Sequence, residues 1–600
     1  MWPFCGLTPT KAVVILHDMY LRTVKVRSSK GTVNEYIRVV EAFRDNGKVK
    51  QRTLAELGRK DLLVELLPKL QRLLGQDAGT ESADSKDLDV LDASTWGPIL
   101  AVRTLFDQLG LWSILDAALG KAKGVPFTDR AFVLVANRLI HPASEHGLAG
   151  WLETDFVCDR QGRRFLPNWH QRNRVRVHFS QLEAWYRTLD QLLAAKEQIE
   201  LALYHRLRDL FSFKPDLVLY DITSTYFEGA GPINFARHGH SRDEKPHNVQ
   251  VIVGVVMVAG WPIAHHVWAG NRVDSSTVPE AIGDLHRRFG FNRLVFVGDR
   301  GMVTDDNLES IIAQKNGYLV GIKRRRNTKL AQWLGAVDET KWISCPVGIT
   351  AQERTNPPRT RAQEIPSGID GMRVIVVDSD ERRSYEEDMR QKSMERTRIH
   401  LEKLQKRVAA GKLKQPERIG AAAERALQRN HGYRYYSWDI HQGSFRYFEN
   451  ADGLKREKGI EGKYVIATSE TALSVLDVVA IYKELSDVEQ GFRQLKDVLA
   501  VRPIYHQVET RIKAHIFVAA LALLVQRLLH RRLQQAGIDL SPERAMQALA
   551  TVRHVTIRLD DQPERRGVSG GCPDARRVLK ALKLTDLKPP APPQGQETVM

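Results

Sequence analysis

The feature that most constrains the fold is an alternation of short apolar runs and helical segments between residues 217 and 322. Each apolar run is rich in β-branched residues and has the length of a buried strand. The Thr-Val-Pro-Glu sequence at residues 277–280 fits a capping box that opens a helix to Arg288, and residues 305–315 have a helical pattern. The strand-type runs are residues 217–220, 249–258, 294–297 and 318–322. Strands that alternate with helices predict an α/β sheet with helices on its faces.

Two carboxylates stand at strand ends in this region. Asp221 ends the first apolar run, and Asp299 follows the third run after Gly298. A buried carboxylate is costly unless it is paired or bound to a metal, and functional residues of α/β sheets gather at strand ends. Position alone leaves open the alternative that each aspartate only caps a turn or a helix.

A late helix, expected from near Ala472 past Leu499, carries three polar residues at a spacing of seven. Tyr482, Glu489 and Lys496 would line one face, with a rise of ~10.5 Å between successive members. That arrangement suits a nucleic-acid backbone laid along the helix. The alternative is a plain core helix whose apolar stripe has these residues at its border. The stripe consists of Leu485, Val488, Phe492, Leu495 and Leu499.

The charge of the chain points to a polyanionic partner. It has 89 Lys and Arg against 72 Asp and Glu, a net charge of +17 and an isoelectric point near 9.6. Such an excess indicates nucleic acid more often than a membrane surface. A hydrophobic content of 42% is normal for globular proteins and excludes wholesale disorder.

The cysteines and the apolar segments exclude other classes. The four cysteines, Cys5, Cys158, Cys345 and Cys572, form no CxxC pair, so neither a zinc ribbon nor a disulfide framework is encoded. The most apolar stretch, residues 516–525, is too short for a bilayer that needs ~20 residues, so it predicts a buried helix. The N-terminus lacks a secretory pattern. We expect a soluble, cytoplasmic protein.

The composition also suggests boundaries along the chain. The N-terminal part contains a hairpin with an Asn46-Gly47 turn and then a Leu-rich helix over residues 57–74. A helix–turn–helix shape over residues 127–153 is compatible with DNA docking. The expected parts are an N-terminal hairpin and helix (1–76), a linker (77–92), a helical and DNA-binding region (93–211), a first core part (212–323), an insertion domain (324–473), closing helices with a catalytic Glu (474–536), and a helical region with a disordered Pro-rich tail (537–600).

Three motifs together carry a family resemblance. They are YDITSTYFEG (residues 220–229), VGDRGM (residues 297–302) and the Y-x6-E-x6-K pattern of the late helix. This set resembles the DDE transposases of bacterial insertion sequences, of the IS-four superfamily type with its Tyr-Arg-Glu-Lys signature. The stretch 492–523 also looks like that family, and looser similarity extends over residues 36–58 and 138–153.

The resemblance implies an RNase H-like catalytic core, interrupted by an insertion domain and preceded by a mostly helical N-terminal region. It places the catalytic and metal-binding carboxylates at Asp221, on the first strand, Asp299, after the fourth strand, and Glu489, on a later helix. Three clustered carboxylates need cations, so two Mg²⁺ ions are expected, with Mn²⁺ able to substitute. One metal would activate the attacking water or 3′-hydroxyl, and the other would stabilise the leaving oxygen.

The resemblance also implies the DNA contacts. The signature arginine should lie three residues after Tyr482, where this chain has Leu485, and Arg493 is the obvious substitute. Trp342 and Trp438 are candidates to stack on a flipped base, and His265, His266 and His515 are more simply structural than metal ligands. The expected contacts are Tyr482, Lys496, Arg493, Arg300, Arg324, Arg325 and Arg326.

The implied function is cut-and-paste transposition by DNA cleavage and strand transfer at terminal inverted repeats. Its partners would be double-stranded inverted-repeat and target DNA, with a homodimer in the active complex and no membrane. No Walker A pattern is present, so no nucleotide cofactor is expected. Two alternatives stay open: an RNase H-like nuclease that does not join DNA, and a catalytically silent DNA-binding descendant.

Overall fold

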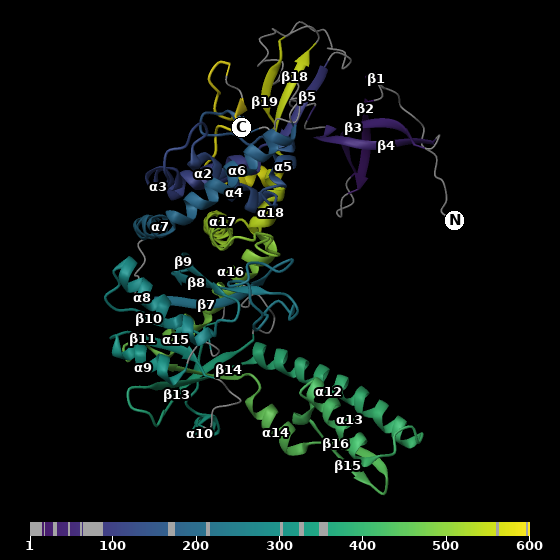
Figure 1. Ribbon diagram of the computed structural model, residues 1–600, viewed down its shortest axis with the longest axis vertical. Helices are drawn as coiled ribbons and strands as arrows, with labels where there is room; N and C mark the ends of the chain where they lie inside the picture. The colour runs from purple at the N-terminus through teal and green to yellow at the C-terminus, as the bar shows by residue number, and fades with distance from the viewer. Residues whose placement is uncertain are drawn as a thin grey trace. The chain divides into compact units, whose positions relative to one another are not determined.

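The chain divides into two compact units, which the computed structural model in Figure 1 describes over most of their length. Unit 1 comprises residues 1–104, 147–172 and 530–600, and unit 2 comprises residues 105–146 and 173–529. The described residues are 15–16, 19–27, 33–45, 48–60, 63, 88–165, 174–211, 217–299, 304–322, 329–346, 358–559, 563–595 and 598–599.

Unit 1 begins with a four-stranded antiparallel sheet in the order β1-β2-β3-β4, so the expectation of a mostly helical N-terminal region is wrong here. The predicted hairpin is confirmed, because Asp45 and Lys48 pair across the turn. The predicted start of the helix over residues 57–74 is wrong, because Leu57 lies in β4. Residues 64–74 lie outside the described part of the chain. Cross-strand ion pairs such as Arg38–Glu56, at 2.6 Å, favour the extended form. The strands are β1 (Ile15–Leu16), β2 (Met19–Arg27), β3 (Val33–Asp45) and β4 (Lys48–Arg59).

A second antiparallel sheet of unit 1 has the order β19-β18-β5. The C-terminal region therefore contains strands as well as the expected helices. Its described Pro-rich tail is packed, unlike the disordered tail expected from composition: the Trp96 indole donates a hydrogen bond to the Leu587 carbonyl at 2.7 Å, and β20 pairs with β6. The elements are β5 (Leu88–Thr95), α5 (Leu148–Thr154), β6 (Arg164–Phe165), α18 (Pro542–Leu549), β18 (Arg553–Leu559), β19 (Arg565–Val568), α19 (Pro573–Ala581) and β20 (Thr598–Val599).

The helical pattern expected between Trp96 and Phe211 is confirmed. One further helix, α17 (Glu509–Gln535), is long and apolar enough by composition to cross a membrane. However, 83% of its most apolar window is buried within the fold, as in a core helix and as predicted for residues 516–525. The helices between Trp96 and Phe211, besides α5, are α2 (Gly97–Leu109), α3 (Leu111–Ala118), α4 (Phe127–Ile140), α6 (Arg174–Ala194) and α7 (Lys196–Phe211).

The centre of unit 2 is a nine-stranded mixed sheet, counted over the described residues. Its order is β12-β13-β14-β17-β11-β10-β7-β8-β9; β10 runs parallel to β7 and β11, and the other pairs are antiparallel. All strands of the predicted α/β region are present, and their helices follow as expected. These elements are β7 (Leu217–Tyr226), β8 (Gln250–Val258), β9 (Trp261–Ala269), α8 (Val278–Phe289), β10 (Val295–Gly298), α9 (Asp305–Ala313) and β11 (Gly317–Gly321).

Two local predictions in this region need correction. β7 does not end at Asp221 but continues to Tyr226, because the β-branched residues that follow pair with β8. Thr277 does precede α8, but its side chain makes no capping hydrogen bond to the helix. Its hydroxyl donates to the Asp274 carbonyl at 2.7 Å instead, and Glu280 accepts a hydrogen bond from the Trp268 indole.

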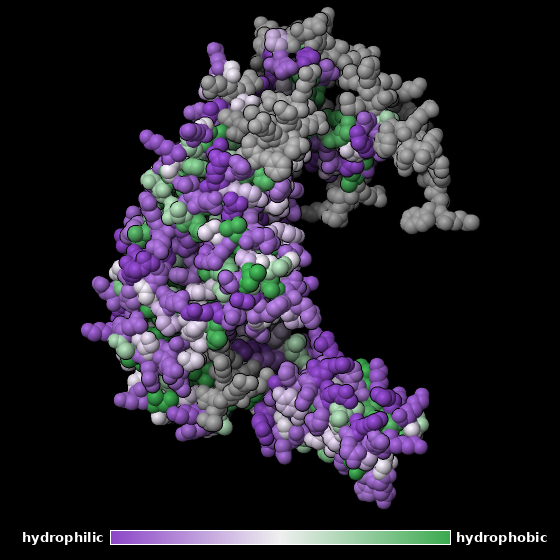
Figure 2. All heavy atoms as spheres, viewed as in Figure 1, coloured by the Kyte–Doolittle hydropathy of each residue, from purple (hydrophilic) through white to green (hydrophobic). Residues whose placement is uncertain are grey.

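The segment 324–473 contributes to this sheet and also forms a core of its own. Strands β12, β13, β14 and β17 extend the sheet beyond β11. Between β14 and β17 lie α12, α13, α14, β15 and β16 (Figure 1). They pack around an apolar cluster that includes Leu401, Ile419 and Phe445. The visible face over α12 and α13 is mostly hydrophilic (Figure 2), as expected for this highly charged stretch. The elements are α10 (Leu330–Gly335), β12 (Ile343–Ser344), β13 (Thr360–Ile365), β14 (Arg373–Ser379), α12 (Asp380–Ala409), α13 (Pro416–Arg429), β15 (Tyr436–His441), β16 (Ser444–Glu449), α14 (Ala451–Ile460) and β17 (Lys463–Thr468).

The single late helix predicted from near Ala472 to beyond Leu499 is instead three consecutive pieces. They are α15 (Val475–Lys483), α16 (Leu485–Arg493) and a π-helical turn over Gln494–Val498. A π turn adds a residue per turn, so side chains beyond it leave the face predicted from α-helical spacing. The apolar stripe through Val488 and Leu495 is buried as expected, and α16 packs against β7.

Candidate active site

The strand register places two of the predicted carboxylates side by side. β7 and β10 are parallel neighbours in which Leu219 pairs with Val297. Asp221 and Asp299 each follow these partners by two residues, so they stand at the same level on the same face. Adjacent strands lie ~4.8 Å apart, which brings the two side chains within reach of a common ion.

The third carboxylate, Glu489, lies on α16, the helix that packs against β7. Asp221 is half-buried, and its Oδ1 accepts a hydrogen bond from the Ile222 amide at 2.8 Å. Burial raises the pKa of Asp221 to about 7; the Ile222 hydrogen bond opposes the shift, and the negative charges of Asp299 and Glu489 add to it. The structure therefore brings the three predicted residues into one electrostatic neighbourhood.

Glu489 experiences the same repulsion. Although much of its side chain is exposed, desolvation of its carboxyl and the charge of Asp299 raise the pKa of Glu489. The nearby guanidinium of Arg493 lowers it. The raised pKa values indicate that negative charge here is not fully balanced by protein cations. An oxygen-only donor set of this charge fits hard divalent cations such as Mg²⁺.

The predicted DNA contacts of the late helix lie on separate pieces of it: Tyr482 on α15, Arg493 on α16 and Lys496 in the π turn. Tyr482 is half-buried and its ring stacks on Tyr464 at 5.7 Å. Lys496 lies in the π turn, is 9% exposed, and its ammonium forms an ion pair with Asp243 at 2.6 Å. Arg493 is exposed at the end of α16. Leu485, at the position of the signature arginine, is 7% exposed and belongs to the core.

The remaining predicted contacts divide into two groups. Both tryptophans are partly exposed and held by carboxylates: the Trp342 indole donates to Glu339, and the Trp438 indole donates to Glu424, each at 3.0 Å. The four arginines of the other group, Arg300, Arg324, Arg325 and Arg326, lie outside the described residues.

Sequence reasoning missed the charged residues of the β7–β8 loop. The Arg242 guanidinium pairs with Asp274, its amide donates to Ser224 Oγ at 3.0 Å, and its charge lowers the pKa of Asp221. The adjacent Asp243 binds both Lys496 and Arg502. The dense run of charges in residues 237–247 is the one signal that could have indicated this role.

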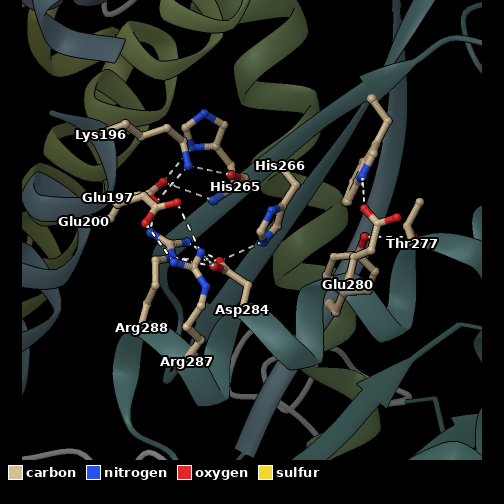
Figure 3. Close-up of polar contacts among 12 residues, drawn as sticks. Lys196, Glu197, Glu200, His265, His266, Thr277, Glu280, Asp284, Arg287 and Arg288 are labelled. Carbon is tan, nitrogen blue, oxygen red and sulfur yellow. Dashed lines mark hydrogen bonds and ion pairs between the residues drawn. The ribbon is translucent and has the colours of Figure 1, made fainter. Parts of the chain in front are cut away.

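The predicted structural role of His265 and His266 agrees with the ionic network of α7, β9 and α8 in Figure 3. His265 Nδ1 lies 2.9 Å from Glu200, and His266 Nε2 lies 3.4 Å from Asp284. Burial lowers the pKa of each imidazole to about 4. Both rings are therefore neutral at pH 7 and serve as polar core residues.

His515 belongs to another tight group, with Glu145 and His506, whose possible ligand atoms lie within 4.8 Å of one another. This group fits a metal poorly. The guanidinium of Arg138 lies 3.1 Å from His515 Nδ1, while His515 Nε2 lies 3.3 Å from the Val501 carbonyl, so both ring nitrogens are engaged. A buried arginine beside the ring would also repel a cation.

Comparison with known families bears on this site. Residues 21–83 match the family described as "IS1634 family transposase, N-terminal domain". Residues 212–525, just over half of the chain, match "Transposase DDE domain", and this stretch contains Asp221, Asp299 and Glu489.

Among solved structures, the chain is similar to a piggyBac transposase synaptic complex with hairpin DNA. The likeness has 9% sequence identity and a TM-score of 0.34, and it covers 76% of this chain and 80% of the other. A search among curated proteins finds no match. By the extent of the DDE match, together with the N-terminal match, this chain is a DDE transposase of the IS1634 family, an enzyme of DNA transposition by phosphoryl transfer.

Proposed function

We propose that the chain catalyses cut-and-paste transposition of an insertion sequence, with Asp221, Asp299 and Glu489 as its metal-binding catalytic residues. The observation that carries the assignment is their joint placement. Two lie at one level on the parallel strands β7 and β10, and the third lies on the helix that packs against β7. Placement in the IS-four superfamily, from the Tyr482–Glu489–Lys496 spacing, belongs to the same proposal.

The carboxylates would hold two Mg²⁺ ions, or Mn²⁺ in their place, and these ions supply activation of the attacking oxygen and stabilisation of the leaving oxygen. The protein itself supplies position and charge. Asp221 must be deprotonated to serve as a metal ligand. The positive charge of Arg242 favours that state, because it offsets part of the rise in the pKa of Asp221. Arg493, Tyr482 and Lys496 would contact DNA phosphates near the cut, and for Lys496 this requires one of its donors to reach beyond Asp243.

The proposed partners are terminal inverted repeats and target DNA, held by a homodimer, because two transposon ends must be paired. The net charge of +17 supports a DNA partner. We also propose a cytoplasmic location with nucleoid association when DNA is bound. We keep the domain boundaries inferred from the sequence as part of this proposal, with a sheet in the N-terminal part (1–76), a packed C-terminal tail in its described residues, and the sheet-forming strands of residues 324–473 assigned to the catalytic core.

The test is a Mg²⁺-dependent cleavage and joining assay on DNA that carries the inverted repeats flanking the gene. Wild type is compared with Glu489→Ala, and DNA binding is measured in parallel. Joined product from wild type alone, with binding retained by the variant, supports the proposal. Cleavage without joining supports a nuclease instead. Binding without cleavage by either protein supports a silent DNA-binding descendant.

A further inference from the structure

The loop between β7 and β8 carries a buried carboxylate, Asp243, which contacts two cationic side chains that follow α16 in the sequence, Lys496 and Arg502. Asp243 has a side chain that is 3% exposed; its Oδ1 accepts a hydrogen bond from the Lys496 ammonium at 2.6 Å and forms an ion pair with the Arg502 guanidinium at 2.5 Å. Because both contacts end on one oxygen, the two cationic nitrogens lie no more than about 5 Å apart. Two cations so close together would repel one another without the carboxylate between them.

We propose that Asp243 is a positioning residue of the transposition reaction, which holds Lys496 and Arg502 together as a cationic fork for one DNA phosphate. The inference rests on the proposed function and deepens it. It assigns the fork to the sugar–phosphate backbone, because phosphate oxygens are the acceptors that an ammonium and a guanidinium bind jointly.

The fork keeps donors available for such a phosphate. An ammonium has three N–H donors, and Lys496 uses one of them on Asp243; a guanidinium has five. Arg502 directs one nitrogen to Asp243 and another to the exposed carboxylate of Asp497. Arg502 also lines a cavity of about 680 Å³ together with Tyr505 and Arg511, so space and further positive charge lie beside the fork.

The same loop connects the fork to the catalytic carboxylates. Asp243 follows Arg242, whose amide donates to Ser224 on β7, three residues beyond Asp221. The charge of Arg242 acts on Asp221. One short loop would therefore fix the position of a phosphate held by the fork relative to β7, the strand that carries Asp221.

The second oxygen of Asp243 distinguishes this arrangement from an ordinary structural ion pair. Within the described residues, Oδ2 is buried and has no hydrogen-bond partner, which costs stability. It also makes Asp243→Asn a matched variant. The amide oxygen can keep the hydrogen bond from Lys496 and the contact with Arg502, the NH₂ group takes the unpartnered place, and the negative charge is lost.

The charge matters because Lys496 sits among cations. Burial and the positive charges of Arg502 and Arg242 lower the pKa of Lys496, while the hydrogen bond and charge of Asp243 oppose this shift. Without the charge of Asp243, the ammonium loses its proton at a lower pH. A pH profile of DNA binding therefore reports the fork directly, since a merely structural carboxylate would not move its alkaline limb.

The experiment measures binding of the inverted-repeat end, without metal and at fixed ionic strength, from pH 7 to 9.5. Wild type and the control Asp497→Asn should weaken by less than about threefold over this range, whereas Asp243→Asn should weaken at least about tenfold, the effect of one pKa unit. Adding Lys496→Arg to Asp243→Asn should restore a flat profile, because a guanidinium keeps its proton.

Other outcomes overturn the inference. If Asp243→Asn has the pH profile of the wild type, the charge of Asp243 does not control the protonation of Lys496. If this variant binds DNA more tightly than the wild type at pH 7, Asp243 competes with DNA for the two cations. Asp243→Glu, which keeps the charge but displaces it, should bind about tenfold more weakly at every pH. If neither variant folds, Asp243 is a structural residue. Failure of the wild type to bind and cleave would instead overturn the proposed function.

Discussion

The carboxylates Asp221, Asp299 and Glu489 and the carboxylates Glu200 and Asp284 lie in the same unit, yet their surroundings are opposite. Within the described residues, none of the first three forms an ion pair at 4.0 Å or less, and burial together with the charge of Asp299 raises the pKa of both Asp221 and Glu489. Glu200 is contacted by the three cationic or imidazole side chains of Lys196, His265 and Arg288, all within 2.9 Å (Figure 3).

Ion pairs balance the charge of Glu200 within the fold, whereas the described residues supply no ion pair to Asp221, Asp299 or Glu489. Burial alone would raise the pKa of Glu200, but the charge of Lys196 and the hydrogen bond to His265 outweigh it and lower the pKa. The network joins α7, β9 and α8 and is complete within the protein. The three carboxylates of the candidate site form no such ion pairs among the described residues, and a divalent cation would balance their charge.

The largest expected effect is on activity at the catalytic group. Asp221→Asn should lower cleavage by at least about a thousandfold, because a neutral amide is a poor ligand for Mg²⁺. It should leave the melting temperature of the metal-free protein unchanged or raise it, because it removes like-charge repulsion. Cleavage assays and thermal melts check both parts. A variant that loses activity only because it unfolds would assign Asp221 to the structural class of carboxylates.

The next effect is on stability, at the ionic network. Glu200→Ala removes the carboxylate that both Lys196 and Arg288 contact, although Arg288 keeps Asp284, and should destabilise unit 2 by about 3 kcal/mol. Denaturant unfolding followed by a probe in unit 2 measures the loss. The variant should still bind metal and cleave DNA at low temperature, where it remains folded. A large loss of activity in the folded variant would break the distinction between the two groups.

The two groups should also respond to pH with opposite sign. The pKa of Asp221 in the folded protein, about 7, lies above its ordinary value. The protonated carboxyl therefore stabilises the metal-free fold, fully at pH values below the ordinary pKa, and this stabilisation is lost as the pH rises through 7. The pKa of Glu200 is lowered, so its contribution is present above its ordinary value and is lost as pH falls below it.

Thermal melts of the metal-free protein between pH 5 and 8 test the first sign. Relative to Asp221→Asn, the melting temperature of the wild type should fall as the pH rises, because only the wild type carries this carboxyl, while buried imidazoles such as His265 shift both proteins equally. Mg²⁺ should raise it more at pH 8 than at pH 5.5, because the ion binds the deprotonated carboxylates. An equal Mg²⁺ effect at both pH values would show that Asp221 does not titrate with the metal site.

The sequence could single out the three carboxylates of the candidate site because the evidence for them is local; their catalytic role stays a prediction. Asp221 and Asp299 follow apolar runs whose length and β-branched content mark buried strands, and the motifs around them identify the family. The spacing of Glu489 and Lys496 was also visible. The prediction that they share one face assumed an unbroken α-helix. A π turn at Gln494–Val498 changes the helical period there, and no residue in the turn indicates this change.

The ionic network and the Asp243 fork could not be predicted for a different reason. Glu200 meets His265 across 65 residues of chain, and Asp243 meets Lys496 across 253. Such pairs depend on which elements become neighbours in the folded sheet, which periodicity within one segment does not encode. The N-terminal sheet was partly visible as a hairpin, but β4 continues through residues whose Leu-rich pattern favours a helix, because pairing with β3 outweighs local propensity.

The smallest expected effect lies at the edge of the ionic network. Glu197 contacts Arg287 at 3.2 Å, and both side chains are more than 60% exposed, so solvent screens the pair. Glu197→Ala should therefore change the stability of unit 2 by less than about 1 kcal/mol, and the change should vanish at high salt. The same unfolding experiment, run at low and at 1 M salt beside Glu200→Ala, measures it. A loss comparable to that of Glu200→Ala would mean that the network acts as one cooperative body, and that exposure does not separate its members.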